Sequence, residues 1–357
     1  MRPMTSSDVL RRRIAAQRLR GPGVQCAADV VRLLACVQSQ ECAHAFWSLG
    51  MRAPGLGYAD VQAEFDAGIL LRTHILRPTW HLVAAEDIRW ILAATSARVQ
   101  QLNGTMYRRE ELGPATLARG AELIIALLRG GHYRTRAELG AALTAEGLVA
   151  NRFRLAYVIM NAELEGLISS GPMRGTQQTY ALLDERAPEA GSRRGDLGEL
   201  AWRFYAGHGP ASVRDLARWA TLTQSQAGSA TEAAAERLEQ VDVDGVAHWF
   251  DPAAPETPGV DRALLLPVYD EATLTYPAVN FPRAELYPQA AHPEPSAGAV
   301  VVGEANIGTW RRELRGKNVI VDVAVARGRS ARELRLVTAA AEELAAFLGR
   351  QLELTIR

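Results

Sequence analysis

The first part of the chain combines helical spacing of apolar residues with a stretch in which apolar and polar residues alternate. Residues 27–38 place apolar side chains three or four positions apart, which predicts an amphipathic helix. Residues 58–67 follow as a second helix, and the alternation over 69–83 predicts two strands around the turn at Arg77-Pro78. Helices followed by a strand pair in this order are typical of a winged helix.

The same order of signals recurs in the middle of the chain. Thr135 and Glu138 have the spacing of a capping box, which predicts a helix that begins there and ends at Gly147. A further helix is expected over 151–167. Residues 168–183 then have the pattern of two strands joined by a glycine-containing turn, so this segment predicts a second winged helix.

A third copy follows a Pro-, Gly-, Ser- and Arg-rich linker at 184–195. Ser212 and Asp215 open one helix, and an Ala-rich stretch at 231–238 predicts another. Residues 241–250 alternate around Asp-Gly, which is a strong hairpin signal and supplies the wing.

The character of the sequence changes after residue 262. Pro-rich spacers such as 288–295 separate apolar, β-branched runs. A helix over 330–349, with Ser330 as its N-cap and Glu333 three residues on, precedes a final strand over 353–356. The runs that predict strands are 263–266, 300–302 and 319–325. We therefore expect an α+β fold of three tandem winged helices plus a β-rich, barrel-like C-terminal domain. The predicted domains are 1–108, 109–190, 191–258 and 259–357.

Charge and composition narrow the class of protein. The formal net charge of the 357 residues is zero, which argues against a uniformly basic surface and leaves room only for a local basic face. No apolar run approaches the roughly 18 residues of a membrane span, and no signal-peptide pattern occurs at the N-terminus. Cys26, Cys36 and Cys42 form no CxxC pair, so we expect a cytoplasmic protein with neither disulfides, metal nor cofactor.

The segment Gln38-Ser39-Gln40 is the main candidate for chemistry. On a helix the two amides would lie about 200° apart, whereas an extended backbone puts positions i and i+2 on one face. The glutamines can therefore cooperate only if the helix ends near Gln38. The strand pair of the same segment would then bring Arg77, Thr79 and His81 near that end. The alternative is that the glutamines form a solvated helix face.

A family resemblance rests on motifs that occur in a fixed order. The chain resembles the AlkZ-like winged-helix DNA glycosylases, which include self-resistance enzymes of antibiotic producers. The matching stretches are ACVQSQ at 35–40, LRT at 71–73, RPTWHLV at 77–83, LLPVYDE at 265–271 and GTWRR at 308–312.

The resemblance implies a concave, monomeric protein that grips duplex DNA containing alkylated bases and hydrolyses the N-glycosidic bond of the lesion. By position, Gln38 and Gln40 would be the catalytic pair. Asp270 is a possible helper, although a cap or structural role is the simpler interpretation, and His81 could equally be a core histidine. The Gln-x-Gln form resembles the branch linked to bulky natural-product adducts. Because Lys317 is the only lysine, a lyase step through a Schiff base is not expected.

Candidate DNA contacts lie on the second winged helix and in the C-terminal domain. The N-terminal residues of a recognition helix face a DNA groove, and arginines beside strand ends can bind phosphates. Each of these side chains could instead be a solvated surface group. The candidates are Arg152, Arg154, Arg174, Gln177, Gln178, Arg311 and Arg312. A non-catalytic winged-helix regulator or a drug-adduct binder remains the alternative function.

Overall fold

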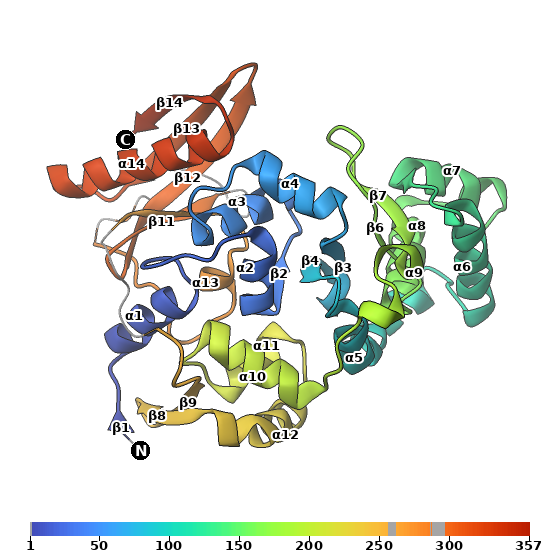
Figure 1. Ribbon diagram of the computed structural model, residues 1–357, viewed down its shortest axis with the longest axis horizontal. Helices are drawn as coiled ribbons and strands as arrows, with labels where there is room; N and C mark the ends of the chain where they lie inside the picture. The colour runs from blue at the N-terminus through green and yellow to red at the C-terminus, as the bar shows by residue number, and fades with distance from the viewer. Residues whose placement is uncertain (1, 256–261, 286, 288–296) are drawn as a thin grey trace. The chain divides into compact units, whose positions relative to one another are not determined.

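The computed structural model describes residues 2–255, 262–285, 287 and 297–357 (Figure 1). The chain forms two compact units, each assembled from separate stretches of sequence. The first comprises 1–61, 202–215 and 234–357, and the second comprises 62–201 and 216–233. Helices and mainly antiparallel strands occur in both, which confirms the predicted α+β class. The predicted domain boundaries stay predictions.

The C-terminal part of the first unit is a five-stranded sheet with strand order β10-β11-β12-β13-β14. Helix α14, Ala331–Phe347, packs along these strands (Figure 1) and begins with the predicted cap at Ser330. The strand bounds are β10 Leu264–Leu266, β11 Gly298–Val302, β12 Ala305–Arg315, β13 Asn318–Val325 and β14 Gln351–Ile356. The predicted strands and closing helix are confirmed, while the long strand β12 was not predicted, and the spacer at 288–295 lies outside the described residues.

The expectation of a barrel-like C-terminal domain is wrong. Within the described residues, β10 and β14 are the two edges of the sheet, and the sheet does not close on itself. β14 reaches its place through the α14 crossover and pairs with β13 in parallel, whereas the other neighbouring strands are antiparallel. The sheet is therefore open, with α14 packed along it.

The N-terminal part of the first unit is mainly helical. It contains α1 Ser6–Ala16, α2 Ala27–Leu34, the short strand β2 Cys36–Gln38 and α3 Cys42–Arg52. A three-stranded sheet of β1 Arg2–Pro3, β8 Glu239–Val243 and β9 Val246–Phe250 belongs to the same unit. The β8–β9 turn has positive φ at both Asp244 (53°) and Gly245 (80°), as a tight hairpin turn requires, so the predicted hairpin is confirmed.

Four further helices are α4, which follows α3, and α10, α11 and α12, which lie in the third predicted winged-helix segment. The predicted helix opened by Ser212 is α11, and its cap is confirmed by the hydrogen bonds between Ser212 and Asp215. The predicted helix at 231–238 begins earlier and ends earlier, because residues 235–237 form a 3-10 turn. The bounds are α4 Tyr58–Asp66, α10 Leu197–His208, α11 Val213–Trp219 and α12 Gln224–Ala234.

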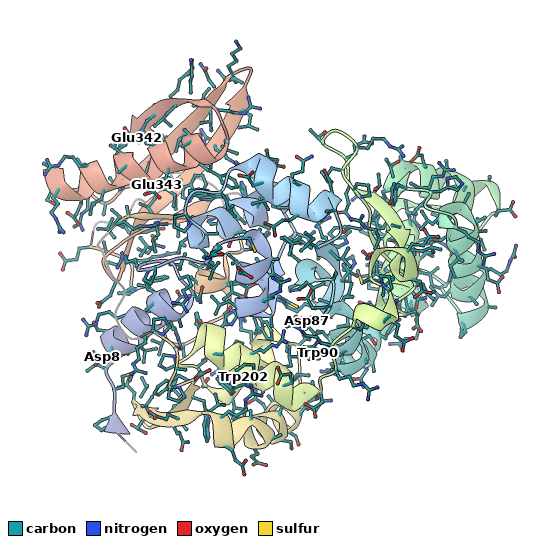
Figure 2. All side chains as sticks on the ribbon, in the orientation of Figure 1. Asp8, Asp87, Trp90, Trp202, Glu342 and Glu343 are labelled. Atoms are coloured by element: carbon teal, nitrogen blue, oxygen red, sulfur yellow. The ribbon has the colours of Figure 1, made fainter. Side chains whose placement is uncertain are left out.

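The second unit contains the hairpin β3 Leu70–Arg77 and β4 Thr79–Ala84, as the sequence predicts. The long helix α5, Ile88–Arg109, follows it. The side chains of Asp87 and Trp90, labelled in Figure 2, meet at the start of α5, where the Trp90 Nε1–H donates to Asp87 Oδ1 over 2.9 Å. Both side chains are buried, so this contact fixes the junction between hairpin and helix.

A complete winged helix lies within the second unit. Helices α6, α7 and α8 pack around one apolar core that includes Ile124, Leu143 and Ile159, and the sheet order is β5-β7-β6. The capping box of Thr135 and Glu138 and the Asn151 cap of α8 are both present, which confirms the predicted second winged helix. The bounds are α6 Pro114–Leu128, β5 Arg134–Thr135, α7 Arg136–Ala145, α8 Arg152–Leu164, β6 Ile168–Ser170, β7 Thr179–Leu182 and α9 Leu183–Arg186.

Candidate active site

The Gln-Ser-Gln segment begins where a helix gives way to a strand. Helix α2 ends at Leu34, four residues earlier than the sequence predicts, because Ala35 adopts a φ of +61° that cannot continue a right-handed helix. Residues Cys36–Gln38 are then extended as β2. A positive φ at a non-glycine residue is uncommon and often occurs near functional sites. The backbone condition for cooperation between the two glutamines, a helix that ends before Gln38, is met.

Gln38 has unused hydrogen-bonding capacity in a buried place. Its side chain is 7% exposed, and within the described part of the chain its amide oxygen Oε1 is buried and has no hydrogen-bond partner. Leaving such an acceptor unsatisfied costs roughly 1–3 kcal/mol, so a donor or a positive charge placed there would be stabilised. Ser39 is fully buried and Gln40 is partly exposed. The Gln38 carbonyl can therefore accept a hydrogen bond or stabilise a positive charge.

The main chain of Gln38 is held by a glutamate that the sequence analysis did not select. The Gln38 N–H donates to Glu271 Oε1 over 2.8 Å, and the Glu271 side chain is fully buried. Glu271 opens the short helix α13, Glu271–Leu274. Its position directly after Asp270, in one of the motifs of the resemblance, was the signal in the sequence that could have found it.

Asp270 occupies a cap at the same helix. Its Oδ1 accepts the Ala272 N–H over 2.9 Å, and Ser48 donates to Oδ2 over 2.7 Å. The Arg52 guanidinium donates to both carboxylate oxygens, and neither side chain is exposed. All of these contacts are structural, and they leave the carboxylate no direct access to a substrate.

The start of α3, directly after Gln40, lies beside a cationic side chain. Arg312 of β12 donates from Nη2 to the Ala43 carbonyl over 3.1 Å. Burial lowers the pKa of the Arg312 guanidinium. The pKa of His44 is lowered to about 4, mainly by burial and in addition by the positive charge of Arg312. His44 is therefore neutral at pH 7. The guanidinium adds to the positive end of the α3 dipole, so this part of the first unit favours an anion.

In the second unit, three predicted supporting residues contact one another. The His81 Nδ1 lies 2.9 Å from the Thr79 carbonyl, and Arg77 Nε donates to His81 Nε2 over 3.3 Å. Because a carbonyl can only accept, the proton belongs on Nδ1, and Nε2 then accepts from Arg77. These bonds favour a neutral, fully buried His81. The arrangement is a local structural contact of the hairpin.

The predicted contacts on the second winged helix differ in how firmly they are bound. Arg154 donates to the Glu110 carbonyl over 2.7 Å, so it stabilises the fold. Arg152 lies over the exposed ring of Phe153, 4.8 Å from its centroid, at the start of α8. Arg174 pairs with Glu138 over 2.9 Å and donates to the Tyr133 carbonyl over 2.9 Å at an exposed position. Arg152 is thus the best placed of the three arginines for a phosphate contact.

The two wing glutamines border a cavity of about 510 Å³ within the second unit. Gln178 accepts a hydrogen bond from Arg72 through Oε1, and in the described residues its buried Nε2 has no partner. The guanidinium of Arg72 also lies over the Trp80 ring, 4.4 Å from its centroid. Gln177 pairs through its main chain with Arg174 at the tip of the wing.

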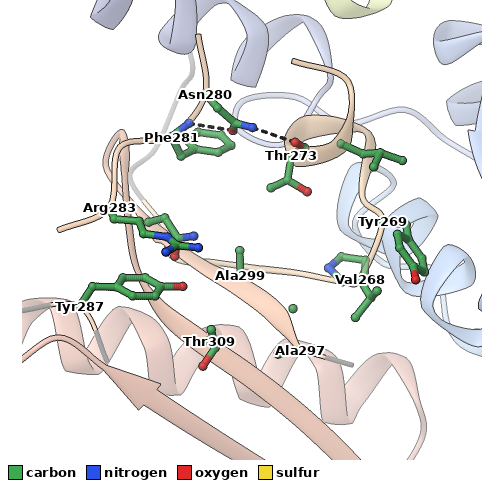
Figure 3. A pocket seen from close by; sticks show the side chains of 14 residues that line it. Val268, Tyr269, Thr273, Asn280, Phe281, Arg283, Tyr287, Ala297, Ala299 and Thr309 are labelled. Carbon is green, nitrogen blue, oxygen red and sulfur yellow. Dashed lines mark hydrogen bonds between the residues drawn. The ribbon is translucent and has the colours of Figure 1, made fainter. Parts of the chain in front are cut away.

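Another cavity, of about 410 Å³, lies beside α13 in the first unit (Figure 3). Asn280 closes one side, because its Nδ2–H donates to the Thr273 carbonyl and its Oδ1 accepts the Phe281 N–H, each over 2.8 Å. Arg283 and Tyr287 also line it, whereas Gln38 and Glu271 do not. A groove of about 680 Å³ on the C-terminal sheet is lined by Arg311, Arg312, Arg315 and Arg357 together with Glu313 and Asp322. Both predicted C-terminal arginines border this charged surface, in which the two acidic residues pair with Arg311, Arg315 and Arg357.

In the described residues, Cys26, Cys36 and Cys42 form no disulfide. Across residues 2–255, 262–285, 287 and 297–357, no group of three or more His, Cys, Asp or Glu residues is arranged to hold a metal ion. The helices in those residues also include none that is long and apolar enough to cross a bilayer.

Comparison with known proteins gives one consistent result. The family model for AlkZ-like DNA glycosylases matches residues 31–347. The fold is similar to that of the solved structure of Streptomyces sahachiroi DNA glycosylase AlkZ, with a TM-score of 0.77 and 21% identity over 99% of this chain and 100% of the other. No curated protein matches the chain. The family match covers both glutamines, Glu271 and every predicted contact residue.

Proposed function

We propose, on the premise that this chain belongs to the AlkZ-like DNA glycosylase family, that it excises cationic purines alkylated at N7 or N3 from duplex DNA. DNA glycosylases hydrolyse the N-glycosidic bond between base and deoxyribose. The observation that carries the proposal is the buried Gln38 amide oxygen at the end of β2, which is unpartnered in the described chain. Gln40, two residues on, would be the second catalytic glutamine.

The chemistry needs no general acid. A purine alkylated at N7 or N3 already carries a positive charge, so it departs as a neutral base without being protonated. The sugar then develops oxocarbenium character, as in other glycosidic hydrolyses. A preorganised amide carbonyl in a buried place stabilises this charge more strongly than it would in water, and the second amide can orient the attacking water. Gln38 and Gln40 supply the residue types that this reaction requires.

The proposed reaction is monofunctional. A lyase step needs an amine that forms a Schiff base with the sugar. Lys317, the only lysine, lies in the turn between β12 and β13. Among the described residues, no contact places its amine at the Gln38 segment. We therefore propose that hydrolysis leaves an intact abasic site.

DNA would be held through local basic surfaces, because the net charge of the chain is zero. Arg311 and Arg312 of β12 are suited to phosphates in the first unit, and the Arg312 guanidinium is also the charge beside the start of α3. In the second unit, Arg152, Arg174, Gln177 and Gln178 would contact the duplex through α8 and its wing. We further propose that the protein acts as a monomer in the cytoplasm. Bulky natural-product adducts would be among its substrates, in a role in antibiotic self-resistance.

Release of N7-methylguanine from duplex DNA by the purified protein tests the proposal. A transcriptional regulator or an adduct-binding protein would bind DNA but release no base. We expect the wild-type protein to release N7-methylguanine and the Gln38→Ala variant to release almost none. Failure of the purified, folded wild-type protein to release any alkylated purine would reject the proposed function.

A further inference from the structure

Glu271 is joined directly to the proposed catalytic strand. One carboxylate oxygen, Oε1, accepts the main-chain N–H of Gln38 over 2.8 Å, although the two residues are 233 positions apart. Both residues belong to the first unit. The contact fixes the peptide from which the Gln38 side chain projects, and it lies at the end of β2, where the strand has no further residue to hold it.

The second carboxylate oxygen is also occupied. Thr275 donates its hydroxyl to Glu271 Oε2 over 3.1 Å, and His208 Nε2 lies 3.5 Å from the same oxygen. The other ring nitrogen, His208 Nδ1, lies 3.2 Å from the Phe204 carbonyl and must donate to it. The Thr275 hydroxyl therefore holds the second carboxylate oxygen, and the buried His208 ring of α10 packs beside it.

The short helix that carries Glu271 is itself fixed from several elements. Tyr276 donates to the His208 carbonyl over 2.8 Å and accepts from Gln17 of α1 over 2.9 Å. Gln17 in turn accepts from Arg52 of α3 over 2.7 Å, and Arg52 binds the Asp270 cap. Every side chain in this chain of contacts is buried. Glu271 is consequently a rigid support and has no exposed surface with which to touch DNA.

We propose that Glu271 is a positioning residue of the glycosylase reaction, which aims the Gln38 amide by holding its main-chain N–H. This inference rests on the proposed function of Gln38. The unpartnered Oε1 of Gln38 is held by no hydrogen bond of its own within the described residues, so its direction depends on the backbone. Displacement of a catalytic group by about 1 Å can lower a rate by roughly 10²-fold.

The test compares single-turnover release of N7-methylguanine and duplex affinity for the intact protein and its Glu271 variants. Glu271→Ala removes the acceptor and should lower the release rate by about 10-fold to 100-fold, with the dissociation constant for DNA within about threefold. Glu271→Gln should restore most of the rate, because its amide oxygen can still accept the Gln38 N–H and its amide N–H can donate to His208 Nε2. Normal release by Glu271→Ala would overturn the inference. Equally slow release by Glu271→Ala and Glu271→Gln would also overturn it, because that result would indicate a role for the negative charge.

Two further variants keep the result interpretable. Glu271→Asp retains the negative charge but moves the acceptor oxygen away from the Gln38 N–H by one methylene, so its release rate should also be lowered. It tests the positioning role if Glu271→Ala does not fold. Asp215→Asn changes another buried carboxylate of the first unit, the cap partner of Ser212, and should release base normally. If Gln38→Ala releases base normally, the proposed function of Gln38 fails. If only the Glu271 variants do so, the positioning role alone fails.

Discussion

Arg52 and Asp270 form a bidentate ion pair that is completely shielded from solvent, with Nη1···Oδ2 and Nη2···Oδ1 distances of 3.0 and 2.9 Å. Removing one partner of such a pair leaves a buried charge without compensation and typically costs about 3–5 kcal/mol. The pair also connects α3, which follows the glutamines, to α13, which carries Glu271. Its loss should therefore affect stability before it affects chemistry.

Asp270→Asn should lower the free energy of unfolding by about 3 kcal/mol, measured by urea denaturation. The folded fraction should still release alkylated bases within a few fold of the wild-type rate, because Asp270 has no access to substrate. A stable variant that no longer excises would instead show that the Asp270 contacts are needed to hold α13 and Glu271 in place for the reaction. Arg311→Gln, an exposed change on β12, is the control for stability and should leave it nearly unchanged.

The glutamines should act on the transition state and not on binding. Gln38→Ala or Gln40→Ala should each lower the single-turnover release of N7-methylguanine by about 10²-fold or more, with duplex affinity within a few fold. Gln240→Ala, an exposed change on β8, is the matched control and should behave as wild type. Normal release by both Gln38→Ala and Gln40→Ala would reject the catalytic assignment.

The sequence predicted elements best where a short local signal determines the backbone. The Asp244-Gly245 turn needs two positive φ values, and the capping boxes at Thr135 and Ser330 require only residues three positions apart. The end of α2 lies four residues before the end that the sequence predicts. Val37 continues the helical spacing of apolar residues, but Ala35 ends the helix by adopting a positive φ. Because this residue is not a glycine, the sequence gives no sign of the positive φ.

The candidate site was only partly predictable for a physical reason. Gln38 and Gln40 form a local pattern, so they could be selected from the sequence. Glu271 reaches Gln38 only through tertiary folding, and the buried state of the Gln38 oxygen depends on side chains distant in sequence. The barrel-like expectation failed similarly, because apolar strands predict a sheet but do not determine whether its edges meet.

The depressed pKa of His44, about 4, makes stability depend on pH. The unfolded state takes up a proton near pH 6.5, whereas the folded state does not until about pH 4. Stability from this group is thus present above pH 6.5 and is lost as pH falls toward 4, at up to about 1.4 kcal/mol per pH unit. His44→Gln should show a shallower loss over this window in urea titrations. Parallel slopes for the two proteins would contradict this role for burial and Arg312.

The single lysine predicts the state of the product. DNA treated with the protein should retain intact abasic sites, and borohydride should trap no covalent complex between protein and DNA. Denaturing gels, with and without alkaline cleavage of abasic sites, measure both. A trapped complex that is lost in Lys317→Ala would replace the monofunctional mechanism by a lyase mechanism.

The last prediction concerns how the lesion is reached, and it follows from the aromatic side chains near the glutamines in sequence. Enzymes that extrude a base enclose it between aromatic and apolar side chains. Phe46 and Trp47 are buried, and Trp47 donates to the Leu265 carbonyl over 2.8 Å and packs on Phe347. The ring of Trp80, in the second unit, contacts Arg72 and His74.

These rings are engaged in the core or in local contacts, so none is a stacking surface reserved for a base. We therefore expect the glutamines to meet the sugar from a groove while the modified nucleotide stays largely in the stack. Recognition would then depend on the positive charge and lability of the lesion, and its size would be tolerated. Release should persist for N7-alkylguanines with large substituents and should fall steeply for neutral lesions such as uracil or 8-oxoguanine. Single-turnover rates on matched duplexes measure this, and efficient uracil removal, or a rate that declines as the N7 substituent grows, would reject the open site.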